Sequence, residues 1–214
     1  MYQERPGALL PPRMGAIATV ESQPRRTQAE RPLGRVDQLS FRGALRALPT
    51  GVTVLTSAGP QSLCAVTASA VTSLSLEPPL MLACLRADSA AAAAIAGNGA
   101  FAINVLGADQ QMLARRFAAP ARPRGAATFD GVAHELGITG AVLLHGAVAW
   151  LECRLQQLHD GGDHVILIGE LLGCDGDPSR EPLVFHAGGY RALGDRSPRT
   201  ASGPCLQTGT AERG

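Results

Sequence analysis

The feature that most constrains the fold of this chain is a succession of short apolar segments, each bounded by residues that favour turns. Many of their side chains are β-branched, which favours extended strands. In chain order the segments are VTVLTS (52–57), LCAVTAS (63–69), LMLACL (80–85), AFAINVL (100–106), VLLHGAVAWLECRLQQL (142–158), HVILIGELLGC (164–174) and PLVFH (182–186). Many strands with few helices between them argue against a doubly wound parallel sheet. The sequence therefore predicts a mainly β protein, a mostly antiparallel barrel with a few packed helices.

Three other segments have helical patterns. They are DQLSFRGALRALPTG (37–51), DSAAAAAIAGNG (88–99) and DQQMLARRFA (109–118). In the first, apolar side chains recur at i, i+3, i+4 and i+7 from Phe41, and Pro49 ends the pattern. We expect this helix to be amphipathic.

The chain is predicted to contain one domain between two tails. Of its 214 residues 45% are hydrophobic and 17% are charged, which suits one globular domain with a sizeable core. Residues 1–36 are rich in Pro, Arg and Gln and have no sustained periodicity, and residues 195–214 are similar. We expect both tails to be disordered around a domain at 37–194.

Charge, apolar run length and cysteine spacing argue against nucleic-acid and membrane partners and against a secreted protein. The formal net charge of +1 gives no reason to expect nucleic acid or an acidic membrane surface as a partner. No apolar run is long enough to span a bilayer, and the first residues do not resemble a signal peptide. The cysteines are odd in number and no two have C-x-x-C spacing: Cys64, Cys84, Cys153, Cys174 and Cys205. We therefore expect a cytoplasmic protein without a disulfide framework or a metal site.

The segment CLRADSAAAAAIAGNG (84–99) joins the end of a strand to the start of a helix. Ser89 stands at or near the N-cap, before five alanines. The unpaired amides of the first helical turn would favour an anion, and the small alanines would let a ligand approach. The alternative interpretation is an ordinary capped helix with an alanine-rich packing face.

The segment VTASAVTSLSLEPP (66–79) is dense in small hydroxyl side chains and ends at two prolines. Its backbone and hydroxyl groups could hydrogen-bond to the polar edge of a flat heteroaromatic ring. The alternative is a β-turn or an edge strand whose hydroxyls are solvated.

Two further segments carry charged side chains. Arg115 and Arg116 stand at the end of a predicted helix, where arginine either binds phosphate or stabilises the helix dipole. The turn HDGGDH (159–164) carries two histidines and two aspartates. Because no other segment of the chain is seen to contribute ligands, a metal site is not expected there. A ligand-docking point, a general base and an ordinary hairpin remain open for His164.

Motifs of common enzyme classes are missing. No G-x-G-x-x-G follows a strand, so a Rossmann cofactor site is not supported. No G-x-S-x-G indicates a hydrolase, and Cys/His catalysis would need a cysteine outside the apolar runs.

Taken together, seven segments resemble the flavin reductase-like domain family in order and spacing, over residues 39–194. They are FRGALRALPTGVTVLTS, AVTASAVTSLSLEPPLMLACL, DSAAAAAIAGNGAFAINVL, LARRFA, GAVAWLECRL, GGDHVILIGELLG and PLVFHAGGYRAL. The resemblance implies an FMN-binding split barrel, usually a homodimer. Members of this family are the reductase components of two-component flavin monooxygenases.

The resemblance also implies which residues form the site. The residues matched to the isoalloxazine contact, largely through the backbone, are Ala65, Val66, Thr67, Ser69 and Ala70. Those matched to the ribityl chain and phosphate are Cys84, Leu85 and Ser89, and a further flavin-contacting pair is Arg116 and Phe117. On the nicotinamide side the matched residues are His186, Gly188, Gly189, Tyr190 and His164, the last as the catalytic candidate.

The function implied is transfer of a hydride from NADH or NADPH to FMN or FAD, with reduced flavin supplied to a separate monooxygenase. Such a reaction needs few acid or base residues because the cofactors carry the chemistry. The alternatives are an FMN-binding protein without turnover and a flavoenzyme of the same fold that acts on an organic substrate. Arg191 would face either the 2′-phosphate of NADPH or solvent, so the sequence does not choose between the two donors.

Overall fold

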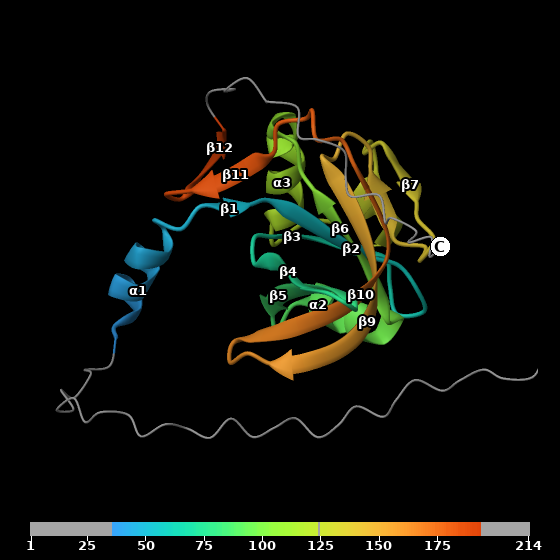
Figure 1. The fold of residues 1–214 in the computed structure, drawn as a ribbon, viewed down its shortest axis with the longest axis horizontal. Coiled ribbons are helices and arrows are strands. Elements are labelled where there is room, and N and C mark those ends of the chain that lie inside the picture. The colour runs from blue at the N-terminus through green and yellow to red at the C-terminus, as the bar shows by residue number, and fades with distance from the viewer. Residues whose placement is uncertain (1–35, 124, 194–214) are drawn as a thin grey trace, which may run out of the picture. The chain divides into compact units, whose positions relative to one another are not determined.

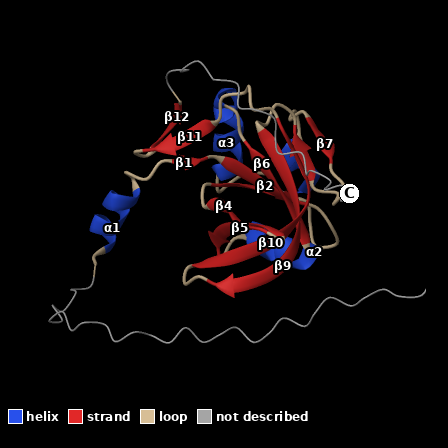
Figure 2. Ribbon diagram, in the orientation of Figure 1, coloured by secondary structure: helices blue, strands red, loops and turns tan. Residues whose placement is uncertain are grey.

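Antiparallel strands dominate the regular structure of the computed structural model, which describes residues 36–123 and 125–193 (Figures 1 and 2). Every strand pairing in these ranges is antiparallel, and only a few helices accompany the strands. The predicted fold class is therefore confirmed. The two expected tails, apart from Val36, lie outside the described residues, as does Cys205.

The main sheet has seven strands in the order β3-β2-β6-β9-β10-β5-β4. Their bounds are β2 Thr53–Ser57, β3 Cys64–Ala68, β4 Val71–Leu76, β5 Pro79–Arg86, β6 Ala100–Val105, β9 Ala149–Asp160 and β10 His164–Gly176. The two edge strands, β3 and β4, follow each other in the chain with only Ser69 and Ala70 between them. Such a link spans about 11 Å at most, so the sheet has to curl until its edges approach. Cys84 N, on β5, donates to Ala70 O at 2.8 Å.

Two smaller sheets complete the strands. One has the order β1-β11-β12, and the other pairs β7 with β8. Their bounds are β1 Thr50–Gly51, β7 His134–Leu136, β8 Val142–Leu144, β11 Leu183–His186 and β12 Gly189–Ala192. The prediction of one continuous strand over 142–158 was wrong, because the chain turns between β8 and β9. Gly146 has a φ of +76°, a left-handed conformation that residues with a Cβ rarely adopt.

The three predicted helices are present. They are α1 Gln38–Leu45, α2 Ala90–Asn98 and α3 Gln111–Ala118, with short 3₁₀ turns at η1 Ala108–Gln110 and η2 Gly125–Phe129. The predicted N-cap of α2 is confirmed, since Ala92 N donates to Ser89 Oγ at 3.1 Å. The apolar face expected for α1 is uncovered, because no residue of this helix is buried. None of the described helices is long and apolar enough to cross a membrane.

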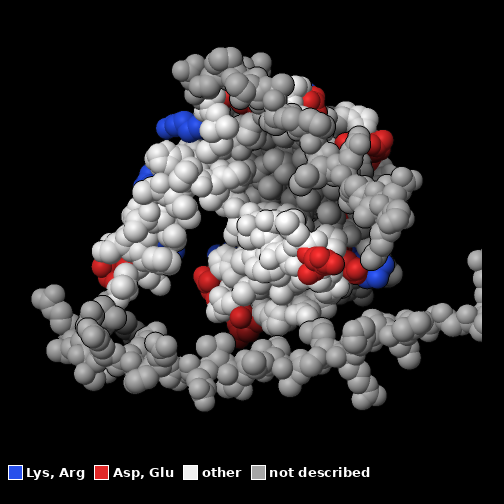
Figure 3. Space-filling model, viewed as in Figure 1, with Lys and Arg blue, Asp and Glu red and all other residues white. Residues whose placement is uncertain are grey.

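Two apolar clusters form most of the core. One surrounds Phe117 and Phe129 of α3 and η2, and the other surrounds Phe101 of β6 and Ile95 of α2. On the face drawn in Figure 3, acidic and basic residues are intermingled on a mainly uncharged surface.

A buried asparagine joins the small sheet to the large one. Asn104 of β6 is fully buried, and its Nδ2 donates to Val54 O and Val142 O, both at 3.2 Å. Its Oδ1 accepts from Leu144 N at 2.7 Å. The neighbouring Thr56 Oγ1 also donates to Val142 O, at 2.6 Å. Side-chain hydrogen bonds therefore hold β8 against β2 and β6.

We expect Asn104→Ala to lower the free energy of unfolding by about 3 kcal/mol, because three buried backbone groups each lose a hydrogen bond, although Val142 O keeps the bond from Thr56. Chemical denaturation monitored by circular dichroism measures this change. Thr72→Ala is the control, since this exposed hydroxyl bonds only to the adjacent Ser73 O, and a change within about 0.5 kcal/mol is expected. Equal stability of the two variants would contradict the role given to Asn104.

Candidate functional site

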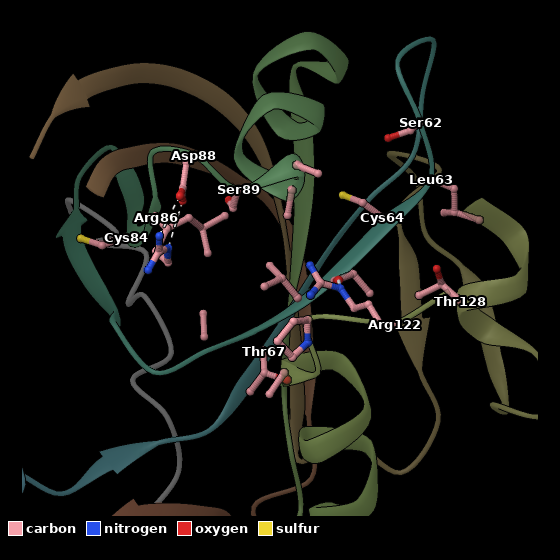
Figure 4. Close-up of a pocket in the computed structure, with 18 of the residues that line it drawn as sticks. Ser62, Leu63, Cys64, Thr67, Cys84, Arg86, Asp88, Ser89, Arg122 and Thr128 are labelled. Atoms are coloured by element: carbon pink, nitrogen blue, oxygen red, sulfur yellow. Dashed lines mark hydrogen bonds and ion pairs between the residues drawn. The ribbon is translucent and has the colours of Figure 1, made fainter. Parts of the chain in front are cut away.

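A cavity of about 740 Å³ lies where the two edges of the large sheet approach each other (Figure 4). This volume is within the range of roughly 300–1,000 Å³ that is common for ligand sites. The lining residues are 62–70, 84–86, 88–91, 118, 120, 122, 123, 125, 128 and 164. They come from β3, from the end of β5 with the start of α2, from the segment after α3, and from the first residue of β10.

The first wall is the free edge of β3. This strand pairs with β2 on one side and with no described strand on the other. Ala65 O points to the free side, because it accepts a hydrogen bond from Arg122 Nε at 2.9 Å. Alternate residues of a strand direct their backbone groups to the same side, so the N–H and C=O of Thr67 also face the cavity. The Thr67 hydroxyl is not free to donate there, since it donates to Ala114 O at 2.7 Å.

The second wall is the N-terminus of α2. Ser89, Ala90 and Ala91 line the cavity. The Ser89 hydroxyl satisfies one amide of the first turn, and the remaining early amides have no partner within the helix. Their partial positive charge suits an anion, and the methyl side chains let it come close. The cavity therefore contains both features that the sequence offered as alternatives, a capped helix and an accessible helix N-terminus.

An exposed ion pair, Arg86 with Asp88, and an exposed contact between His164 and Asp163 lie at the cavity. Arg86 makes two bonds to Asp88, at 2.9 and 2.7 Å, and this arginine holds the pKa of the Asp88 carboxyl below its usual range. His164 Nδ1 lies 2.7 Å from Asp163 Oδ1, and the histidine likewise lowers the pKa of the Asp163 carboxyl. The carboxylate favours a proton on Nδ1, which leaves Nε2 as the second polar atom of the ring.

The turn before His164 is a hairpin between β9 and β10. Gly161 N donates to His164 O at 2.9 Å, and Gly162 N donates to Asp160 Oδ1 at 2.8 Å. Gly162 has a φ of +82°, which accounts for glycine at this position. No described group of three or more His, Cys, Asp or Glu residues is arranged to hold a metal ion. The hairpin and the ligand-docking interpretations are compatible, because the hairpin places His164 at the cavity.

A second cavity of about 380 Å³ shares Ala118 with the first. The other residues that line it are Arg115, Ala119, Phe185, Gly188, Gly189 and Tyr190. The Phe185 and Tyr190 rings meet edge to face at 5.4 Å, and the Arg115 guanidinium lies 5.4 Å from the centre of the Tyr190 ring. Two aromatic rings and a cation therefore border a space beside the main cavity.

Most of the residues singled out from the sequence come together around these two cavities. Those that line the main cavity are Ala65, Val66, Thr67, Ser69, Ala70, Cys84, Leu85, Ser89 and His164. Gly188, Gly189 and Tyr190 line the second cavity, whereas His186 lines neither.

Arg116 and Phe117 lie outside both cavities. Phe117 is fully buried and packs on Phe129, with 5.7 Å between ring centres. Arg116 NH2 is 3.5 Å from Ala127 O. A flavin contact by this pair stays a prediction, and the burial of Phe117 assigns its ring to the core.

Arg122 is a cavity residue that the sequence did not reveal. It stands in the stretch AAPARPRGAA, which has no periodicity and no motif. Its proximity to Ala65, which is 57 positions away, arises only when the segment after α3 folds over the edge of β3. The cavity also contains Cys64, where burial raises the pKa of the thiol and so favours the neutral form over a nucleophilic thiolate.

Comparison with known proteins matches this chain to flavin reductases. The family model for the flavin reductase like domain matches residues 45–194. An NADH-dependent FAD reductase of Streptomyces globisporus is 41% identical over 156 residues, which cover 72% of this chain and 85% of that protein. An NADH-dependent FMN reductase of Streptomyces nodosus subsp. asukaensis is 38% identical over 156 residues, 72% and 84% of the two chains.

A solved structure has the same fold. The flavin reductase component of a bacterial two-component tryptophan halogenase superposes with a TM-score of 0.71 and is 43% identical. The match covers 75% of this chain and all of that one.

Proposed function

Because this chain belongs to the flavin reductase-like domain family and is a flavin oxidoreductase, we propose that it uses NADH to reduce FMN or FAD for a separate flavin-dependent monooxygenase. The observation that carries this proposal is that one cavity contains both the free edge of β3 and the N-terminus of α2. A flavin combines a flat ring that has a polar edge with an anionic phosphate, and these two walls fit those two parts. A cytoplasmic location, where NADH is available, belongs to the same proposal.

The edge of β3 would bind the flavin ring. On the free side, the N–H of Ala65 and the N–H and C=O of Thr67 offer hydrogen-bonding groups at fixed spacing along a rigid strand, while Ala65 O already accepts from Arg122 Nε. The side chains of this strand are small, so the ring can approach the backbone. A site that relies on the backbone tolerates a change of side chain at Ala65 and Ala70.

The start of α2 would bind the flavin phosphate. Ser89 keeps its hydroxyl on Ala92 N, and the remaining early amides then face the phosphate. Cys84 and Leu85 lie between the two walls at the end of β5, where the ribityl chain would pass.

The nicotinamide would lie against the ring on the side of His164 and the second cavity. A bound flavin supplies the chemistry of this site by accepting a hydride at its ring. The residues of the chain only have to hold two rings in register and limit access of water. Acid–base catalysis is not needed, which agrees with the lack of a catalytic constellation among the described residues.

We also propose that α1 packs against a second copy of the chain. Phe41 and Leu45, whose spacing places them on one side of α1, are 56% and 48% exposed, and Leu48, three residues after the helix, is 60% exposed. A helix of eight residues is marginal alone in water, so an uncovered apolar side needs a partner. Sedimentation of the full chain is expected to show a dimer, and a monomer at micromolar concentration would contradict this part of the proposal.

The function is tested by mixing the purified protein with NADH and each flavin under air and following the loss of the nicotinamide absorbance. FMN and FAD are compared at equal concentration, and NADPH replaces NADH in a parallel series. Turnover with NADH is expected. Tight flavin binding without NADH oxidation would instead indicate a non-catalytic flavin-binding protein.

Ser89→Asp tests the phosphate position. A carboxylate at the N-cap keeps the capping bond and favours the helix dipole, so stability should be unchanged or slightly higher. The same charge repels a phosphate, so the Kd for FMN should rise about tenfold. Flavin fluorescence measures the binding, and a melting curve measures the stability. Unchanged FMN affinity would leave Ser89 with a purely structural role.

His164→Ala tests the nicotinamide side. Loss of one positioning hydrogen bond costs about 0.5–1.5 kcal/mol, so kcat/KM for NADH should fall several-fold while the Kd for FMN stays within about twofold. Asp160→Ala is the control, because it removes the side-chain bond that supports the same hairpin turn and leaves the His164 ring in place. Steady-state kinetics and melting curves of both variants separate the two effects. An equal loss of kcat/KM in Asp160→Ala would show that His164 acts only through the hairpin.

A further inference from the structure

We infer that Arg122 is a flavin-binding residue whose guanidinium lies beside the flavin ring and favours the reduced, more negatively charged ring over the oxidised one. The inference rests on the proposed function and adds a residue and a physical role that the family resemblance did not supply. It depends on three features of Arg122: its anchoring, its position relative to α2, and the lack of a countercharge.

The guanidinium is anchored on two sides. Its Nε donates to Ala65 O at 2.9 Å and its NH1 donates to Ala119 O at 3.1 Å, so it joins β3 to the segment after α3. NH2 makes no hydrogen bond with any residue in the part of the chain that the structure describes. Arg122 is half-buried and lines the cavity, and Figure 4 shows its side chain extending from one wall towards the middle. One donor group is therefore held in position and directed at a ligand before the ligand binds.

The anchoring places the positive charge of Arg122 at the flavin ring and not at the flavin phosphate. Arg122 is bonded to Ala65, on the strand edge that would bind the ring. Figure 4 shows Ser89, at the start of α2, on the other side of the cavity together with Arg86 and Asp88. With the phosphate at the helix N-terminus, the flavin ring extends towards Arg122.

Arg122 also supplies the unpaired positive charge of the cavity wall. Arg86 is bonded twice to Asp88, and His164 is bonded to Asp163. No described carboxylate lies within ion-pair distance of Arg122. Among the described residues of the cavity wall, Arg86 is thus paired with a carboxylate and Arg122 is not.

Hydride transfer makes this cation useful. When the hydride leaves C4 of the nicotinamide, its two electrons form the new bond at N5 of the flavin, and the flavin ring gains one negative charge while the nicotinamide becomes positive. A fixed guanidinium at the ring stabilises that charge as it develops, without any reorganisation at the moment of transfer. It contributes much less to binding of the neutral oxidised ring.

The test compares Arg122→Gln and Arg122→Lys with the unmodified chain. The Kd values of oxidised and of reduced FMN are measured by anaerobic titration, and the same titrations are made with riboflavin, which has no phosphate. In Arg122→Gln we expect reduced FMN and reduced riboflavin to bind roughly 10- to 100-fold more weakly, the range for a hydrogen bond to a charged group. Both oxidised flavins should change by less than about threefold. Each tenfold change in the ratio lowers the two-electron midpoint potential of bound flavin by about 30 mV.

Arg86→Gln is the matched control. It removes the same charge from the opposite side of the same cavity, and from a guanidinium that Asp88 already neutralises. We expect its ratio of reduced to oxidised affinity to change less than that of Arg122→Gln, and we expect Arg122→Lys to recover most of the preference for reduced flavin. Melting curves of all variants monitor folding.

Three outcomes would overturn the inference. A loss confined to FMN would place Arg122 at the phosphate, and equal behaviour of the Lys and Gln variants would reduce it to a structural clamp. Equal shifts in Arg122→Gln and Arg86→Gln would show that only the total charge of the cavity matters. If the unmodified chain binds flavin but oxidises no NADH, the proposed function fails, and the affinity ratios still decide the role of Arg122.

Discussion

The link of two residues between β3 and β4 determines where this protein can bind a ligand. Strands in a sheet lie about 4.8 Å apart, so the outer strands of a flat sheet of seven are about 29 Å apart, whereas Ser69 and Ala70 span about 11 Å. The sheet therefore curls until its edges meet without forming a ladder. The free edge of β3 thereby has backbone groups without a partner strand, usually a site of unwanted association. Here those groups line the main cavity.

Side-chain hydrogen bonds to the backbone hold the walls in place. The Thr67 hydroxyl joins β3 to α3, and Asn104 joins β6 to β8. The buried carboxylate of Glu152 accepts from Ile138 N and from the amide and hydroxyl of Thr139, at 3.0, 2.9 and 2.6 Å. A buried charge is costly without such partners, and three donors offset that cost. Thr67, which lines the cavity, and the more distant Asn104 and Glu152 therefore use their polar groups to position the backbone.

This use of polar groups suits a reaction in which the protein transfers no proton. A flavin reductase has to bring two rings into contact and to stabilise the charge that passes between them. The aspartates at the cavity, Asp88 and Asp163, are paired with Arg86 and His164, and burial keeps the Cys64 thiol neutral. What remains is a strand edge, a helix N-terminus and one cation that bonds only to carbonyls. The chemistry belongs to the flavin and the nicotinamide.

The amino-acid sequence alone determined the fold class, the three helices, most strands and the N-cap at Ser89, because periodicity, capping and turn residues act over a few positions. The resemblance to a family added nine residues of the main cavity and three of the second. Three features are seen only in the tertiary structure. The chain forms two strands, β8 and β9, where one was expected, Phe117 is part of the core, and Arg122 is bonded to Ala65. Those outcomes depend on contacts between segments far apart in the chain. Local pattern contains no information about such contacts, because curling of the sheet decides which distant residues meet.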